Sequence, residues 1–132
     1  MLNLRDIALE TKTAVVEYPG MEDFKVTIRY VSRAVSKKIL EDSEVKEMKN
    51  GMVVGIKRDE AKFAKGFAAH CIVTWEGLTL EHVSRLMLID LDGKDLSTEV
   101  PYSPDNAEML LTSSNAFNSF IDSAVFELDT FR

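Results

Sequence analysis

The chain has few of the features that define specialised classes of protein. Its one cysteine, Cys71, has no partner for an intramolecular disulfide, which is typical of proteins from a reducing compartment. Only three prolines and six glycines occur in 132 residues, and 45% of the residues are hydrophobic, so a disordered chain is excluded. No apolar run approaches the roughly 20 residues of a membrane-spanning helix, and no secretory signal pattern opens the sequence. We therefore expect a soluble cytosolic protein with no membrane partner.

Positive charge is also scarce. The sequence has 22 acidic and 16 basic residues, a formal net charge of -6. Because contacts to phosphates require clustered Lys and Arg, we expect no nucleic-acid partner. The length predicts a single domain, residues 1–132. Within it we expect an N-terminal arm at 1–12, a β-hairpin at 13–31 and a helical part at 32–132.

The predicted hairpin rests on an alternating pattern. From Phe24 to Tyr30, apolar side chains alternate with polar ones over seven residues, which is typical of a half-buried strand. Val15 and Val16 mark a strand before it, and Pro19-Gly20 lies in the loop between them. An isolated hairpin is marginally stable in water, so we expect its apolar face to pack on the helices that follow.

About five helices are predicted after the hairpin, so the expected fold class is α+β. Helix-capping side chains and apolar residues at steps of three and four define them. The clearest start is Ser103 followed by Pro104, a cap and a proline at the first helical position. Asn50-Gly51 is interpreted as a helix stop, and 52–56 as an extended connector. The expected helices are 33–49, 60–75, 80–89, 104–112 and 117–131.

Residues with reactive side chains do not form a recognisable catalytic or metal-binding motif. His70 and Cys71 are neighbours on a predicted helix and point about 100° apart, so they cannot chelate one metal ion together. Asp90, Asp92 and Gly93 have part of the spacing of a calcium loop, but its first position would be an apolar leucine. We therefore expect no catalytic residues, no metal site and no cofactor.

Phe126 is the one candidate partner-binding residue. It lies about 180° from the apolar stripe of the last predicted helix, at about 100° per residue. An aromatic side chain on that face indicates either a contact with a partner or a second internal packing surface. The sequence does not decide between the two.

Several segments together resemble a known family. They are residues 17–33 (EYPGMEDFKVTIRYVSR), 75–79 (WEGLT) and 99–107 (EVPYSPDNA), followed by Leu110-Leu111 and the spaced pair Phe117 and Phe120. In this order and spacing they resemble the tail assembly chaperones of bacteriophages with long, non-contractile tails. The resemblance spans about residues 17–131.

The resemblance implies a function that composition does not show. Such proteins act in the cytoplasm of the infected host, bind the tape measure protein, keep it soluble and help tail tube subunits polymerise around it. They are absent from the mature virion. The tail tube protein and a longer, frameshifted form of the same chaperone are implied as further partners.

Repeated binding along a long client gains from multivalency, so homo-oligomers are also expected. The main alternative is a structural tail or connector protein of the virion. An enzyme would need a deep polar pocket, for which the sequence gives no indication.

Overall fold

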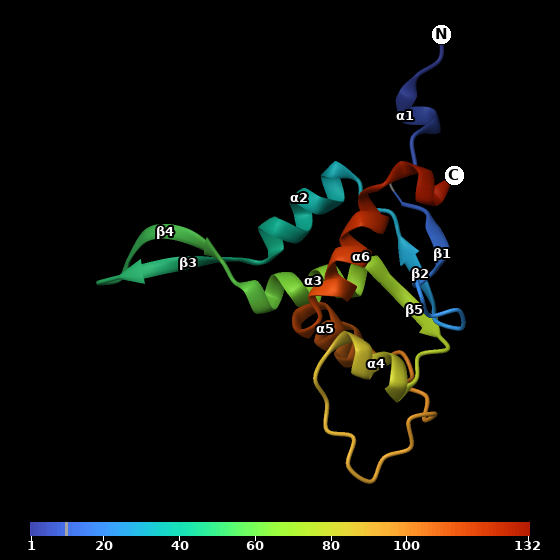
Figure 1. The fold of residues 1–132 in the computed structure, drawn as a ribbon. Coiled ribbons are helices and arrows are strands. Elements are labelled where there is room, and N and C mark those ends of the chain that lie inside the picture. Colours follow the sequence, from blue (N-terminus) through green and yellow to red (C-terminus); the bar gives the residue numbers. More distant parts are fainter. Residues whose placement is uncertain (10) are drawn as a thin grey trace.

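A three-stranded antiparallel sheet, covered on one face by helices, forms the body of the protein (Figure 1). The computed structural model describes residues 1–9 and 11–132. Strands β1 (Thr13–Glu17) and β2 (Lys25–Arg29) form the predicted N-terminal hairpin, with Val16 opposite Val26. The third strand, β5 (Ile72–Glu76), pairs with the other edge of β2. The α+β fold class is confirmed.

The sheet has one buried and one open face, as the alternation in β2 predicts. Val26 and Ile28 are completely buried, whereas Lys25, Thr27 and Arg29 are only half-buried. Burying a Val or Ile side chain stabilises the fold by about 1.5–3 kcal/mol. The hairpin is therefore held by the helices packed on one face of its sheet.

Three helices supply most of the opposing core. They are α3 (Glu60–Cys71), α5 (Pro104–Ser113) and α6 (Asn115–Phe126). Each buries one stripe of side chains, as an amphipathic helix must to be stable. The buried residues of these helices are Phe67, Ala68, Cys71, Ala107, Leu110, Leu111, Phe117, Ile121 and Val125.

The remaining helices lie around this core. They are α1 (Leu4–Ile7), α2 (Arg33–Asp42), α4 (Leu80–Leu86) and a short 3₁₀ helix, η1 (Leu128–Phe131). All of residues 1–9 are exposed, and α1 projects from the body in Figure 1. Glu10, part of the predicted arm 1–12, lies outside the described residues.

The structure corrects the prediction of a helix from 33 to 49. Helix α2 ends at Asp42, and the chain then forms a second hairpin from β3 (Glu44–Lys49) and β4 (Met52–Arg58). Asn50 and Gly51 form its turn, with φ of 53° and 76°. Two successive positive φ values are typical of a type I′ turn, whose twist matches that of paired strands. Residues 52–56 are thus strand, not a connector.

This second hairpin, residues 44–58, projects from the body and is called the β-arm below (Figure 1). Its strands pair with each other and make few contacts elsewhere. At its base the Asp59 backbone N–H donates to the Ser43 carbonyl over 2.7 Å, and the buried Ser43 hydroxyl donates to the Leu40 carbonyl. The β-arm is therefore anchored at the junction of α2 and α3.

Two further predictions are corrected. The helix expected to reach Trp75 ends at Cys71, because the following residues form β5. The helix expected from 117 to 131 ends at Phe126, and the exposed Leu128 begins the separate 3₁₀ helix η1. The predicted helical part, residues 32–132, therefore also contains β3, β4 and β5.

Helix caps are where the sequence and the structure agree most closely. The side chains of Ser32, Asp59, Thr79 and Ser103 each accept a hydrogen bond from a backbone N–H in the first turn of the helix that follows. These bonds satisfy donors that the helix itself leaves without partners. Helix α4 is nevertheless shorter than predicted, since it ends at Leu86.

Candidate interaction surfaces

Phe126 lies at the end of α6 and is 46% exposed. Its ring centroid is 6.3 Å from that of Phe67 on α3, so one side of the ring packs against the protein and the other faces solvent. The structure thus places Phe126 both against its own fold and within reach of a partner. Its role in partner binding stays a prediction.

Two hollows meet at Phe126, and together they are called the Phe126 surface below. The first, about 170 Å³, lies between α2, α3 and α6 and is lined by Ser36, Ile39, Leu40, Phe63, Phe67, Asn118, Asp122 and Phe126. The second, about 550 Å³, is lined by Tyr30, Val31, Arg33, Ser36, Lys37, Leu40 and Phe126. Ser36, Leu40 and Phe126 border both hollows, so the surface is continuous.

The Phe126 surface combines an apolar floor with a charged rim. Leu40 is 37% exposed beside Phe126, and the half-buried Phe63 extends the apolar area. Arg33 and Lys37 line one hollow and Asp122 the other. An apolar centre within a polar rim is the usual anatomy of a protein-binding surface. It suits the apolar face of an amphipathic helix.

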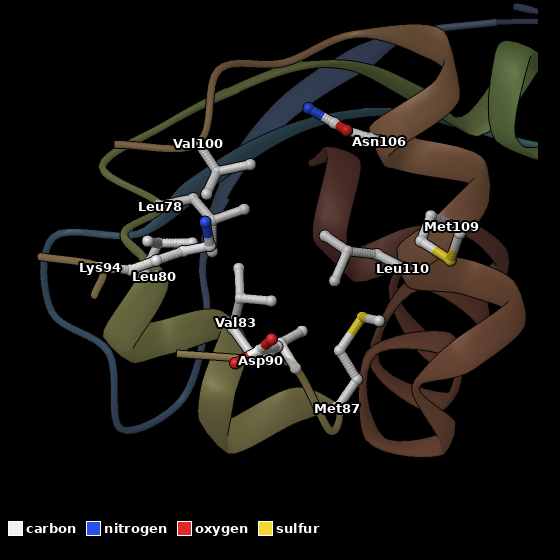
Figure 2. A pocket seen from close by; sticks show the side chains of 11 residues that line it. Leu78, Leu80, Val83, Met87, Asp90, Lys94, Val100, Asn106, Met109 and Leu110 are labelled. Carbon is white, nitrogen blue, oxygen red and sulfur yellow. The ribbon is translucent and has the colours of Figure 1, made fainter. Parts of the chain in front are cut away.

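A separate apolar hollow, called the α4–α5 pocket below, lies on another part of the body (Figure 2). Its volume is about 250 Å³, below the roughly 300–1,000 Å³ typical of small-molecule sites. In Figure 2 the side chains of Val83, Met87 and Leu110 point toward the same space. The full lining is Leu78, Leu80, Val83, Met87, Ile89, Asp90, Lys94, Val100, Asn106, Met109 and Leu110.

Hydrogen bonds to the core hold the wall of this pocket in place. The Leu80 N–H donates to the Thr98 carbonyl over 3.0 Å, and the Val100 N–H donates to the Leu78 carbonyl over 2.8 Å. The Trp75 indole N–H donates to the Val100 carbonyl over 2.9 Å. The pocket is therefore a preformed feature, which lowers the entropic cost of binding an apolar side chain.

The β-arm is the third surface with unusual exposure. Five of its large apolar side chains are between 54% and 69% exposed, and they are Met48, Met52, Val53, Val54 and Ile56. A monomeric protein seldom displays so many apolar side chains together unless they contact a partner. The sequence pattern does not reveal this surface, because residues 44–49 resemble a solvated helix. The Asn50-Gly51 dipeptide was the signal that could have identified it.

Cys71 and His82 occupy structural positions in the fold. Cys71 is completely buried, and burial raises the pKa of its thiol to about 12. The His82 Nδ1 atom accepts a hydrogen bond from the Thr79 N–H in a capping box. Burial lowers the pKa of His70; a backbone hydrogen bond at Tyr30 partly offsets this shift, and the charge of Arg29 adds a smaller lowering. The buried Nε2 atom of His70 has no hydrogen-bond partner among the described residues.

Possible ligand groups for a metal ion are dispersed. In residues 1–9 and 11–132, no three His, Cys, Asp or Glu side chains lie close enough together to hold one ion. The partial calcium-loop spacing corresponds to a turn in which the Asp92 N–H donates to the Asp90 carboxylate over 3.0 Å. Within the same described residues, no helix is both long enough and apolar enough to cross a membrane.

The segments that carry the phage resemblance meet in the core. Tyr102 packs edge-on against Trp75 at 5.3 Å between ring centroids, and its hydroxyl donates to the Ile72 carbonyl over 3.3 Å. The Tyr18 ring is 4.7 Å from that of Phe120 and 6.3 Å from that of Phe117. These motifs therefore stabilise the fold, and the first of them also contributes Tyr30, Val31 and Arg33 to the larger hollow of the Phe126 surface.

Comparison with known proteins identifies a phage-derived α+β protein. A family model described as YdaY prophage protein matches residues 19–132, which is most of the chain. The chain belongs to this family of prophage proteins. No curated protein and no solved structure matches it.

Proposed function

We propose that the protein is a non-enzymatic tail assembly chaperone that binds the phage tape measure protein. It keeps this long client soluble and helps tail tube subunits polymerise around it. It works in the cytoplasm of the infected host and is absent from the mature virion. Its membership of a prophage family and its resemblance to tail assembly chaperones support this proposal.

The observation that carries the proposal is the Phe126 surface. A chaperone for a helical client needs an apolar contact surface that its own fold leaves uncovered. Helix-in-groove recognition uses apolar side chains of the client at positions i, i+3, i+4 and i+7. The two adjoining hollows at Phe126 can receive successive anchors of that kind.

Charge fits this role as well. The net charge of -6 keeps an unloaded copy soluble despite its exposed apolar side chains. Arg33 at the rim, and Lys37 by exchanging its exposed 3.9 Å pairing with Glu41, can pair with acidic residues of a client helix, which would orient the helix in the groove. The tail tube protein and a longer, frameshifted form of this chain are further proposed partners.

The test is co-expression of the full chain with the tape measure protein of the same prophage. We expect the wild-type chain to keep the client in the soluble fraction. Phe126→Ser should release the client into the pellet with little loss of melting temperature, because nearly half of the ring is already exposed. Leu128→Ser is the matched control, since Leu128 is 52% exposed but lines neither hollow.

Two results would contradict the proposal. The client could precipitate to the same extent with and without the chain, which would exclude chaperone activity toward it. Mass spectrometry of purified phage particles could instead find abundant copies of the chain, which would favour a structural tail or connector protein. An equal loss of client binding in both variants would show that the client binds elsewhere than at the Phe126 surface.

A further inference from the structure

The tip of the β-arm combines apolar and positively charged side chains. Met48 pairs with Val53 across the strands, and Lys49 pairs with Met52. Lys46 and Lys49 form no ion pair with any described residue, whereas Lys57 lies 3.9 Å from Glu47. Residues 44–58 carry four basic and two acidic side chains, a net charge of +2 on a protein of net charge -6. The tip is thus a basic, methionine-rich projection on an acidic protein.

The α4–α5 pocket has the complementary character. Its lining is mainly apolar and includes Met87, Ile89 and Met109. The segment that forms it, residues 80–109, carries seven acidic and two basic side chains, a net charge of -5. Of the two basic residues, Arg85 is already paired with Glu81, and Lys94 lines the pocket together with Asp90, so the excess acidic charge lies around the pocket and not on its walls. An occupant with apolar side chains flanked by lysines would fit this pocket in both shape and charge.

We propose that the tip of the β-arm of one copy docks into the α4–α5 pocket of the next copy. Met52 and its neighbours enter the pocket, and Lys46 and Lys49 lie over its acidic surroundings. A cavity of roughly 150 Å³ admits a benzene molecule. The pocket, at about 250 Å³, therefore has room for an apolar side chain of the arm.

This contact is heterologous, because each copy offers its arm to one neighbour and its pocket to another. In Figure 1 the β-arm projects from the junction of α2 and α3, whereas α4 and α5 lie on another part of the body. The β-arm therefore cannot reach the α4–α5 pocket of its own chain without a large rearrangement. Heterologous contacts that do not close into a ring produce open chains.

Pairing of two arms through their edges is a poorer solution for β3. A twofold axis between two antiparallel β3 strands must pass through a pair of identical residues. If the axis lies at the middle of β3, that pair is either Lys46 opposite Lys46 or Glu47 opposite Glu47. Like charges directly opposite one another destabilise a sheet. The β4 edge is interrupted by an irregularity at Val54, and irregularities of this kind protect edges from pairing.

The inference goes beyond client binding, since it needs no client. The interface is small, so it should be weak and concentration-dependent in the free protein. Its charged component should weaken as salt screens the lysines from the acidic surface. Copies lined up on one long client would be held at high local concentration, which favours the same contact.

The test uses sedimentation velocity of the full chain without any client, at rising protein concentration. We expect the wild type to form a ladder of oligomers that shrinks at high salt. Met52→Glu should remove the arm contact, and Met109→Glu should remove the pocket contact. Each should raise the dissociation constant at least tenfold. Both side chains are more than half exposed, so both variants should fold; melting curves check this.

Mixing the two variants gives the decisive result. Met52→Glu keeps an intact pocket and Met109→Glu keeps an intact arm, so an equimolar mixture should form one-to-one dimers and nothing larger. Leu88→Glu is the control, because Leu88 is 99% exposed next to the pocket but does not line it. It should assemble like the wild type.

Three outcomes would overturn the inference. The wild type could remain monomeric at every concentration. Both variants could assemble as well as the wild type does. Met109→Glu could assemble normally while Met52→Glu does not, which would indicate contact between arms. Because no client is present, none of these results bears on whether the Phe126 surface binds the tape measure protein.

Discussion

Replacing Gly77 with alanine should be one of the most damaging single substitutions in this chain. Gly77 has φ of 75°, and a Cβ built on it would lie 1.8 Å from the carbonyl oxygen of Asp23. The left-handed backbone alone costs an L-residue about 1–2 kcal/mol. To reach even 3.0 Å from the new Cβ, the Asp23 carbonyl would have to move by more than 1 Å. That movement would disturb Phe24, which is completely buried.

These contacts give a range for the expected loss in the free energy of unfolding. Removing a buried Phe costs about 3–5 kcal/mol, and partial displacement of Phe24 adds to the backbone cost. We therefore expect Gly77→Ala to lower the free energy of unfolding by about 3–5 kcal/mol, out of a typical total of about 5–15 kcal/mol. This corresponds to a drop in melting temperature of roughly 10–20 °C.

Gly93 provides a matched control. It has φ of 69°, yet nothing lies within 4 Å of a Cβ built on it. Gly93→Ala should therefore cost only about 1–2 kcal/mol. Asparagine tolerates the left-handed region, so Gly93→Asn should be nearly neutral while Gly77→Asn should be about as harmful as Gly77→Ala. Urea unfolding followed by circular dichroism measures all four variants. Equal losses at the two positions would refute the close approach of Gly77 to Asp23.

Three further predictions concern the core. Phe117→Ala should cost about 3–5 kcal/mol in urea unfolding because Phe117 is completely buried, and a loss no larger than that of Phe126→Ala would contradict the assigned core. The Cys71 thiol, with its pKa raised to about 12, should react with a thiol reagent at pH 8 only as fast as the protein unfolds; immediate reaction in the native state would disprove its burial. His70 has a lowered pKa in the folded state, so the unfolded chain binds the proton more readily and stability should fall as pH drops below about 6.5. His70→Gln should make stability depend less on pH in urea titrations between pH 5 and 8. An unchanged dependence of stability on pH would show that other groups cause it.

Local chemistry made the N-terminal hairpin and the helix starts predictable. The alternation from Phe24 to Tyr30 indicates a sheet with one buried face, and this indication does not depend on which elements pack on that face. Ser103 and Pro104 likewise determine where α5 begins, because the unpaired N–H groups of a first turn require an acceptor. In both cases the deciding residues are within one turn or one strand of the element that they define.

The β-arm is hard to predict because the dipeptide in its turn is compatible with two different structures. Asn50-Gly51 can end a helix or turn a hairpin, since both require positive φ. The charged run from Glu44 to Lys49 is compatible with a solvated helix. Where no side chain is buried, intrinsic helix and strand propensities are a weak guide to the secondary structure. The helix ends at Asp42 because the next residue, Ser43, caps it: the buried Ser43 hydroxyl donates to the Leu40 carbonyl, and the Ser43 carbonyl accepts from the Asp59 N–H. The second of these contacts depends on the tertiary structure.

The sequence of strand β5 resembles a helix for a different reason. Ile72 and Trp75 are three residues apart, a helical spacing, and both are buried. In a regular strand, residues three apart face opposite sides of the sheet. An irregularity in the pairing places Thr74 opposite Thr27 and Ile72 opposite Ile28, so Val73 is the extra residue. The bulge therefore reproduces a helical period within a strand. Only the β-branched residues that follow Cys71 favour the correct assignment.

The interaction surfaces were harder to predict than the core, because they depend on what the fold leaves uncovered. Phe126 could be identified from one helix, since its position opposite the apolar stripe is a local property. The α4–α5 pocket could not, because Met87 and Met109 come together only when the intervening segment is held against Leu78 and Leu80. The residues that carry the phage resemblance maintain this scaffold. Phe126 and the tip of the β-arm are exposed, so substitutions there should leave the fold intact, as the tests of both proposals require.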